Sequence, residues 1–372
     1  MFDARLASAT NRLMGACAAN EALTGQIGML ITTTAGAAEK RWAAMKEGRS
    51  PAPVGGGEGD SAVQTVPALQ HKICAALDKL KLQGMHQALQ DEGRYDDIRR
   101  IEDLRDPHQE HTWLYALNPA TEPVMPAQDW VRAMRIRLGC DHMGAEMVCA
   151  ACGTHVLDRQ AYHALCCANG ESTRGHNRVR NELLTGFSAA DPTSAAEVEG
   201  LVPSQPRLRP ADILTGAAHP TLGVAVDVMV KAPNAGGAGQ DCTETGKREK
   251  MERYGPVLHE LRDQGIIYKP AVFSAYGRCH PDVTDMMTEA ARRVARHRGF
   301  ADWKPLFTRW RRQVAVQVWR RAAAMVTRCL TRDDREAAER LLAGEGTRLE
   351  PDLDQGAPPT ATGPLITRWS DN

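Results

Sequence analysis

The hydrophobic positions in the first part of the chain recur with helical spacing. From Pro67 to Leu89 the apolar residues recur mostly three or four positions apart, at Leu69, Ile73, Leu77, Leu80 and Leu82. This period places one apolar stripe along a helix. A second amphipathic run follows Pro126, with Trp130, Met134 and Leu138 on one face and Gly139 suited to end it. We therefore expect two helices ahead of residue 140.

Short β-branched runs replace this pattern between about residues 207 and 274. Residues 207–214 and 222–230 predict two paired strands, the second marked by Val224, Val226, Val228 and Val230. A loop is expected at 233–240 (PNAGGAGQ), then a helix at 244–263 with Met251, Tyr254, Leu258 and Leu261 inward. Residues 266–273 predict a third strand, and Pro270 favours an edge position for it. Helices return from Pro281 to about Leu342.

Breaks in the pattern divide the 372 residues into segments. The run of prolines and glycines at 50–59 predicts a linker, and the Gly-, Pro- and Thr-rich end of the chain predicts disorder. We expect a weakly structured N-terminal region with its linker at 1–65, a helical region at 66–145, a metal-binding segment at 146–180, an α/β core at 181–300, a basic helical region at 301–343 and a disordered tail at 344–372.

Composition limits the class of protein only loosely. The formal net charge is zero, so any nucleic-acid surface has to be local. The ten cysteines are mostly scattered, which is typical of reduced thiols and not of an extracellular disulfide framework. No run approaches the ~18 apolar residues of a membrane span, and Arg5 interrupts any signal-type stretch. We expect a soluble, intracellular protein with no membrane partner.

Four residues have the spacing of a metal site. Cys149, Cys152, His163 and Cys167 form the pattern C-x2-C-x10-H-x3-C. Sulfur and imidazole in a fourfold set select tetrahedral Zn²⁺ with no open position, which indicates a structural site. Cys166 is an alternative to Cys167, and His155 and His176 compete with His163. The other interpretation is a group of ordinary buried thiols.

The predicted strand pair carries two carboxylates. Asp212 ends the first strand and Asp227 lies inside the second. In adjacent strands their oxygens can converge and hold Mg²⁺ against a phosphodiester, with a lysine to stabilise the developing charge. Lys250 on the next helix is the candidate lysine, with Lys247 and Lys231 as rivals. Each of these residue types is also common in turns, strands and solvated helix faces.

A basic stretch follows this region. From Glu289 to Leu330 eleven lysines and arginines stand against two acidic residues, for a net charge of +9. Such a surface suits a phosphate backbone, and the candidate contacts are Arg209, Arg292, Arg293, Arg296, Arg311 and Arg312. Three tryptophans are interleaved, and core packing accounts for Trp303 and Trp310 better than for Trp319, which breaks their spacing.

The order of these blocks resembles the carboxy-terminal part of non-LTR retrotransposon polyproteins that carry a restriction-like endonuclease after the reverse transcriptase. The resemblance runs from about Trp113 to Ala291. Its blocks are Trp113-Leu114, Arg135-Ile136-Arg137-Leu138-Gly139, the cysteine and histidine set with Gly153 and Tyr162-His163-Ala164-Leu165-Cys166-Cys167, His176-Asn177-Arg178-Val179-Arg180, Arg209-Pro210-Ala211-Asp212-Ile213-Leu214, Val226-Asp227-Val228-Met229-Val230, Lys250-x3-Tyr254 and a strand ending near Gly277.

The resemblance implies a fold, an activity and roles. The fold would be an α/β PD-(D/E)xK restriction-endonuclease-like core, a small mixed sheet flanked by helices, with a zinc knuckle ahead of it. The activity would be Mg²⁺-dependent nicking of the DNA strand that primes reverse transcription. Asp212 and Asp227 look like the catalytic Mg²⁺ ligands, Lys250 like a lysine displaced onto the helix, and Tyr254 like its neighbour. Glu182 or Glu199 would supply an accessory acid.

The chain also departs from that family. Met229 stands where the nuclease lysine is usual, Tyr162 where glycine is usual and Gly175 where a basic residue is usual, and Ser274-Ala275 replaces a polar or acidic position. No Tyr-x-Asp-Asp signature of a reverse transcriptase occurs. The resemblance therefore implies a fragment, a domesticated copy or a decayed copy, in the nucleus, with DNA, element RNA and a separate reverse transcriptase as partners. A catalytically inactive nucleic-acid-binding remnant is the alternative.

Overall fold

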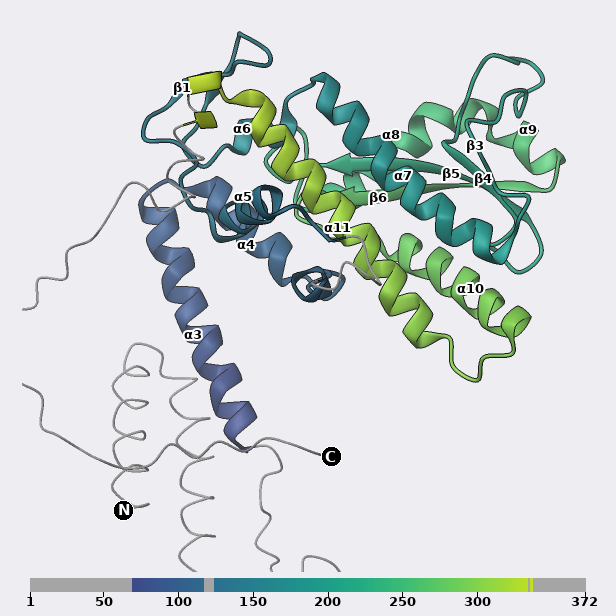
Figure 1. The fold of residues 1–372 in the computed structure, drawn as a ribbon, viewed down its shortest axis with the longest axis horizontal. Coiled ribbons are helices and arrows are strands. Elements are labelled where there is room, and N and C mark those ends of the chain that lie inside the picture. Colours follow the sequence, from purple (N-terminus) through teal and green to yellow (C-terminus); the bar gives the residue numbers. More distant parts are fainter. Residues whose placement is uncertain (1–68, 117–123, 334, 337–372) are drawn as a thin grey trace, which may run out of the picture. The chain divides into compact units, whose positions relative to one another are not determined.

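The computed structural model describes residues 69–116, 124–333, 335 and 336 (Figure 1). The segments expected at 1–65 and 344–372 lie outside these residues. The chain divides into two compact units, Met1–Ile98 and Arg99–Asn372. In the first unit, α3 (Leu69–Asp91) confirms the helix predicted from the apolar spacing. Helix α4 (Tyr95–Arg105) follows it.

The helix predicted after Pro126 is also present. The 3-10 helix η1 (Thr112–Tyr115) precedes α5 (Ala127–Leu138). Gly139 ends α5 in the left-handed conformation, with φ of 71°, and its amide donates to carbonyls of the last turn. Glycine adopts this conformation without the steric cost that a Cβ atom brings, so the sequence-based helix end is confirmed.

A small hairpin and two helices come next. Strands β1 (Met147–Val148) and β2 (Val156–Leu157) pair antiparallel, and α6 (Tyr162–Cys166) follows them. Helix α7 (Gly170–Ala190) begins at Asn169, whose side chain accepts the Glu171 amide. This helix runs through the boundary predicted at 180/181, so the metal-binding segment and the α/β core are joined by one continuous element.

The main sheet has four strands in the order β3-β4-β5-β6. They are β3 (Ala195–Ala196), β4 (Ile213–Thr215), β5 (Gly223–Lys231) and β6 (Ile266–Ser274). The predicted pair is confirmed, because β4 lies antiparallel to β5, although β4 has only three residues. Strand β6 runs parallel to β5 at the edge of the sheet, the position that Pro270 favours.

The helix predicted at 244–263 is broken into three pieces. They are α8 (Cys242–Tyr254), the 3-10 helix η2 (Gly255–Val257) and α9 (Leu258–Asp263). The break falls at Gly255-Pro256, because proline lacks the amide that an uninterrupted helix requires. The inward positions are nevertheless as predicted, since Tyr254, Leu258 and Leu261 are buried with Met251 packed against them.

Helices cover both faces of the sheet (Figure 1). Alternation along β5 sends successive side chains to these two faces. Val224, Val226 and Val228 pack among residues of α7, α10 (Pro281–Arg298) and α11 (Lys304–Cys329). Ala225, on the other face, packs among residues of α9, η2 and Tyr268. The protein is thus a mixed α/β fold with helices on both faces of a small sheet.

Helix α11 belongs to two hydrophobic clusters at once. Its first half packs with α7 and α10, and Trp310 contacts Phe187 edge to face, with ring centroids 5.2 Å apart. Its second half packs with α5, η1 and the hairpin region, where Trp319 stacks on Trp113 at 4.8 Å. Trp319 is fully buried and Trp310 nearly so, while Trp303 is half-buried. Core packing therefore accounts for Trp319, which the sequence pattern did not predict.

A buried histidine between α5 and β1 makes the fold acid-sensitive. His142 is 5% exposed, and its Nε2 atom has no hydrogen-bond partner. Burial, with Arg135 and Arg132 nearby, lowers the pKa of His142 to about 3 from 6.5. The unfolded chain binds this proton first as the pH falls through 6.5, so stability is lost progressively from there down to about pH 3.

We expect this single group to cost about 2 kcal/mol of unfolding free energy between pH 8 and pH 5. Urea unfolding of the wild type and of His142→Leu at both pH values measures the loss. The variant should lose about 2 kcal/mol less than the wild type over that interval. Equal losses in the two proteins would show that His142 does not titrate in this way.

Candidate functional site

The turn that carries Cys149 and Cys152 is fixed by backbone hydrogen bonds. The Gly153 amide donates to the Cys149 carbonyl at 2.8 Å, and the Cys149 amide donates to the His155 carbonyl at 2.9 Å. Gly153 has a φ of 66°, which lets the chain reverse within the turn. As a result both thiols face the start of α6.

Asp158 positions the other two members of the group. Its two carboxylate oxygens accept the amides of Tyr162 and His163, at 2.7 and 2.8 Å. These bonds satisfy free amides at the start of α6, as a helix-capping carboxylate does. Helix α6 then presents His163 in its first turn and Cys167 directly after its end.

The four predicted ligands converge. The ligand atoms of Cys149, Cys152, His163 and Cys167 lie within 4.8 Å of one another, and we call this group the Cys3His cluster. The Cys149 and Cys167 sulfurs are 3.9 Å apart, and the Cys152 sulfur is 3.5 Å from His163 Nε2. Ligands about 2.0–2.3 Å from a tetrahedral zinc ion lie at comparable separations. The cluster could therefore bind a metal such as zinc.

The environment of the cluster favours thiolate at one position. Hydrogen bonds from the side chain and amide of Thr154, and then from His155, lower the pKa of Cys152 to about 4. Burial raises the pKa of Cys167. A metal ion supplies the positive charge that would hold both sulfurs deprotonated.

The structure separates the alternative ligands. Cys166 is exposed on α6, outside the cluster. His155 lies beside the cluster, with its ring stacked on His163 at 5.0 Å and Nδ1 3.6 Å from the Cys152 sulfur. His176 lies on α7, where it contacts Asp212. The suggestion that His176 competes for the metal is therefore wrong.

Asp212 and Asp227 lie close together beside the start of β4. The register of β4 and β5 pairs Ile213 with Val226, and Asp212 directly precedes β4 where the sequence predicted that it would end the strand. The Asp212 amide donates to the Val226 carbonyl at 2.9 Å, and the two carboxylates are close enough for the charge of Asp212 to act on Asp227. Asp227 is 4% exposed, and the Asp212 side chain is 17% exposed.

Asp227 has a partner at each carboxylate oxygen. Lys250 Nζ, from α8, lies 2.9 Å from Oδ1, and the Tyr268 hydroxyl donates to Oδ2 at 2.6 Å. Burial raises the pKa of Asp227 above its ordinary value, although Lys250 and Tyr268 act in the opposite direction. Burial and the adjacent carboxylate also raise the pKa of Tyr268, so its hydroxyl remains a donor.

Asp212 is held from the helix and from the sheet. His176 Nε2, on α7, lies 3.2 Å from Oδ1, and the Val228 amide donates to Oδ2 at 2.7 Å. Burial acts to raise the pKa of Asp212. The His176 contact, the Val228 amide and the charge of Lys250 outweigh burial and lower that pKa below its ordinary value. Asp212 is therefore the more readily ionised of the two acids.

The rival and accessory residues have other partners. Lys231 pairs with Glu249, and Lys247 pairs with Asp282 at 2.9 Å. Tyr254 packs edge to face on Tyr268, with ring centroids 5.5 Å apart. Of the accessory acids, Glu182 contacts Gln317 of α11 and Glu199 pairs with Arg209. Among the candidate lysines, Lys250 is the one whose amine contacts Asp227.

The arginines predicted to contact nucleic acid differ in whether they hold other parts of the fold or lie nearer the surface. Arg293 donates to the carbonyls of Gly216 and His219, each at 2.7 Å, and Arg311 pairs with Glu110 at 2.9 Å, so both hold the fold together. Arg292 lies over the Trp303 ring at 5.0 Å and is exposed. The exposed Arg296 pairs with Glu289, Arg209 pairs with Glu197 and Glu199, and Arg312 is half-buried.

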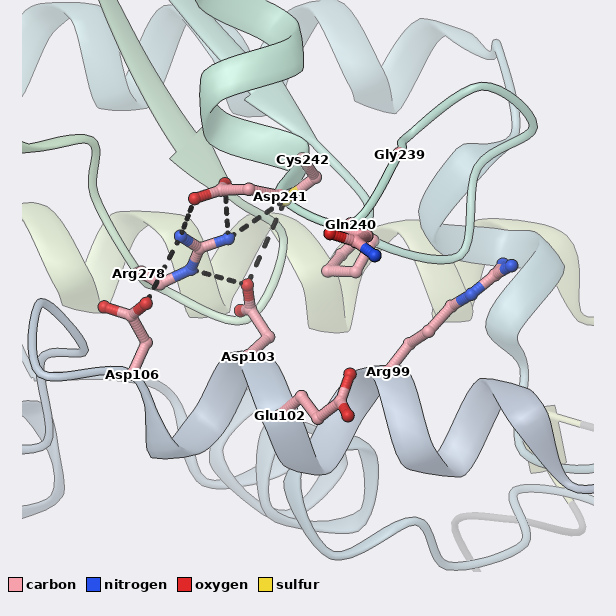
Figure 2. Close-up of a pocket in the computed structure, with 10 residues that line it drawn as sticks. Arg99, Glu102, Asp103, Asp106, Gly239, Gln240, Asp241, Cys242 and Arg278 are labelled. Carbon is pink, nitrogen blue, oxygen red and sulfur yellow. Dashed lines mark hydrogen bonds and ion pairs between the residues drawn. The ribbon is translucent and has the colours of Figure 1, made fainter. Parts of the chain in front are cut away.

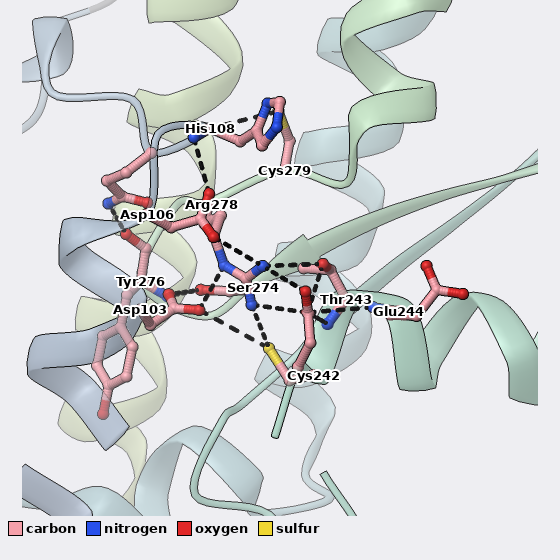
Figure 3. A network of polar contacts seen from close by, with 12 residues as sticks. Asp103, Asp106, His108, Cys242, Thr243, Glu244, Ser274, Tyr276, Arg278 and Cys279 are labelled. Carbon is pink, nitrogen blue, oxygen red and sulfur yellow. Dashed lines mark hydrogen bonds and ion pairs between the residues drawn. The ribbon is translucent and has the colours of Figure 1, made fainter. Parts of the chain in front are cut away.

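A second polar cluster surrounds Arg278. Its guanidinium contacts the carboxylates of Asp103, Asp106 and Asp241, at 2.7, 3.5 and 2.8 Å (Figure 2). Ser274 also donates to Asp103 (Figure 3), and Asp241 caps α8 by accepting the amides of Thr243 and Glu244. A pocket of about 180 Å³ opens beside this cluster, bordered by α4 and the 233–240 loop (Figure 2). We interpret the cluster as a structural link between α4, α8 and the segment after β6.

No protein-family model, no curated protein and no solved structure matches this chain. Within the part of the chain that the structure describes, no helix is long and apolar enough to cross a membrane.

Two residues of the acidic site were not predicted from the sequence. Tyr268 contacts Asp227 across the parallel pair of β5 and β6, in which Ala225 is the register partner of Tyr268. His176 reaches Asp212 from α7, 36 positions earlier in the chain. For Tyr268 the available signal was a tyrosine in a strand whose other residues are apolar except Lys269 and Ser274. For His176 no local signal showed that it would contact Asp212 and not the Cys3His cluster.

Proposed function

We propose that this chain is a metal-dependent DNA endonuclease domain of a retrotransposon-derived protein. In this proposal the α/β core is of the PD-(D/E)xK type, and the Cys3His cluster is a zinc knuckle ahead of it. One observation carries the proposal: the Val228 amide of β5 holds Asp212 beside Asp227, and the Lys250 amine lies 2.9 Å from Asp227. Two acids and a lysine are the groups that phosphodiester hydrolysis with Mg²⁺ requires.

Asp212 and Asp227 would hold Mg²⁺ in this reaction. The ion would polarise the phosphate and lower the pKa of a bound water. His176 and the Val228 amide fix the direction of the Asp212 carboxylate, and Tyr268 fixes that of Asp227. Lys250 carries a positive charge to the place where the phosphate oxygens gain negative charge. Hydrolysis adds one water across a P–O bond and leaves a hydroxyl and a phosphate monoester.

A second candidate is a nucleic-acid-binding protein whose nuclease site is inactive. A specific observation favours it: both oxygens of Asp227 already have donors, one from Lys250 and one from Tyr268. Among the described residues, three or more acidic, cysteine or histidine side chains lie close enough to share an ion at the Cys3His cluster and not at Asp212 and Asp227. Met229 is consistent with this candidate, because it stands where the nuclease lysine is usual and its sulfur packs beside Gly246 of α8.

Cleavage of supercoiled plasmid separates the two candidates. The endonuclease proposal expects the reduced, zinc-loaded protein to convert supercoiled plasmid to open circles in Mg²⁺ and to stop when EDTA is present. A gel shift with the same DNA, without open circles at any Mg²⁺ concentration, would select the inactive binding protein. The absence of both results would overturn the two proposals together.

A further inference from the structure

A fourth thiol lies against the Cys3His cluster. Cys329 is the last residue of α11 and is fully buried. Its carbonyl accepts the Ala150 amide at 2.9 Å, inside the turn between Cys149 and Cys152. The end of α11 is therefore joined to the loop that presents two of the metal ligands, although 180 positions separate Cys149 from Cys329.

The Cys329 sulfur is close to two of those ligands. It contacts the sulfurs of Cys149 and Cys167, and the side-chain amide of Asn169 donates to it at 3.8 Å. All three cysteines belong to one packed cluster of buried residues. Cys149, Cys167 and Cys329 thus form a buried group of thiols that shares two members with the Cys3His cluster.

The two sides of the Cys3His cluster differ in exposure. Cys149 and Cys167 are buried, whereas Cys152 and His163 are half-buried. The imidazole therefore lies on the side that water reaches, and the Cys329 thiol lies on the side that the core encloses. Four thiolates are as suitable for structural zinc as three thiolates with one imidazole.

From these contacts we propose that Cys329 is a reserve ligand of the metal. When the His163 imidazole leaves the ion, the Cys329 sulfur binds in its place and gives a set of four thiolates, Cys149, Cys152, Cys167 and Cys329. The exchange breaks one metal–nitrogen bond and forms one metal–sulfur bond, and the proton of the Cys329 thiol passes to solvent. The site then keeps its ion while α11 becomes a direct part of it. This inference does not depend on nuclease activity.

Metal content of four reduced, full-length proteins tests the proposal. After dialysis against a chelator of moderate affinity, the wild type, Cys329→Ser and His163→Ala should each retain one zinc ion per chain. The double variant His163→Ala with Cys329→Ser should retain none. With Co²⁺ in place of zinc, the sulfur-to-cobalt absorption of His163→Ala should exceed that of the wild type, because a fourth thiolate is bound. Loss of zinc from His163→Ala, or its retention by the double variant, would overturn the proposal.

The rate of zinc transfer to a strong chelator provides a second test that needs only the native histidine. A reserve ligand holds the ion during each dissociation of His163, so Cys329→Ser should release zinc at least about tenfold faster than the wild type. This corresponds to ~1.4 kcal/mol of barrier. Cys140→Ser, which removes an exposed thiol, is the matched control and should match the wild type. Should the His163 variants fail to fold, equal release rates for Cys329→Ser and the wild type would by themselves refute the proposal.

Discussion

Replacing Asp227 by asparagine is expected to reduce Mg²⁺-dependent nicking of supercoiled DNA by at least about 100-fold, or ~2.7 kcal/mol of barrier. An amide keeps the size of the carboxylate but removes the charge that would bind the ion. It also leaves Lys250 without its anionic partner at 2.9 Å. The rate at which open circles form, with protein in excess over plasmid, measures the effect. The same loss is expected for Asp212→Asn.

Asp263→Asn is the matched control for this pair of variants. It makes the same chemical change on α9, at a position that is exposed. Its nicking rate should equal that of the wild type, and all three variants should contain one zinc ion per chain. Nicking by Asp227→Asn or Asp212→Asn at the wild-type rate would show that cleavage occurs elsewhere or is a contaminant.

Replacing Arg278 by methionine is expected to lower the free energy of unfolding by about 3–5 kcal/mol. Methionine fills similar space but removes the guanidinium that pairs with Asp103, which is 5% exposed. Burial raises the pKa of Asp103 even with Arg278 in place, so burial already disfavours the charged form of this carboxyl. Without Arg278 a buried carboxylate is left uncompensated. Urea unfolding at pH 7, followed by circular dichroism, measures the loss.

Two comparisons make this prediction specific. Arg296→Met removes an exposed ion pair with Glu289 at 3.3 Å and should cost less than about 1 kcal/mol. The loss in Arg278→Met should also shrink as the pH is lowered from 7, because an unpaired buried carboxyl takes up a proton and is no longer charged. A loss below 1 kcal/mol at pH 7, or one that does not change with pH, would contradict the role given to Arg278.

The elements that sequence predicts well are those with their own local signal. The α5 helix end at Gly139 needs only a left-handed residue after an amphipathic run. The antiparallel pair of β4 and β5 follows from branched residues on either side of a glycine-punctuated turn. The break after Tyr254 was missed, because the inward residues continue the helical period across Gly255 and Pro256.

The two candidate sites also differ in how far local sequence determines their geometry. The Cys3His cluster is predictable because a turn and one short helix place all four residues, within 19 positions of the chain. The acidic site requires α7, β4, β5, β6 and α8 to meet, and periodicity does not determine how they pack. Asp212, Asp227 and Lys250 were candidates from the predicted strand pair and helix, and the resemblance strengthened them, while His176 and Tyr268 joined the site through tertiary contacts.

The basic region shows that the number of charges in a segment does not tell which side chains are available to a ligand. The net charge of the 289–330 segment suggested a phosphate-binding face, but Arg293 and Arg311 bind carbonyls and a carboxylate of this protein. Trp310 and Trp319 are anchors of the core. A sequence shows the number of charges, whereas their availability depends on which elements pack around them.

The central claim of the proposed function is that Asp212 and Asp227 form a divalent-cation site. Binding of Mn²⁺, which accepts the oxygen ligands that suit Mg²⁺, tests this claim without DNA. Electron paramagnetic resonance of free Mn²⁺ in the presence of zinc-loaded protein gives the number of ions bound. We predict one Mn²⁺ per wild-type chain, displaced by excess Mg²⁺, and none for the variant that carries both Asp212→Asn and Asp227→Asn. Equal Mn²⁺ binding by the wild type and this double variant would contradict the claim.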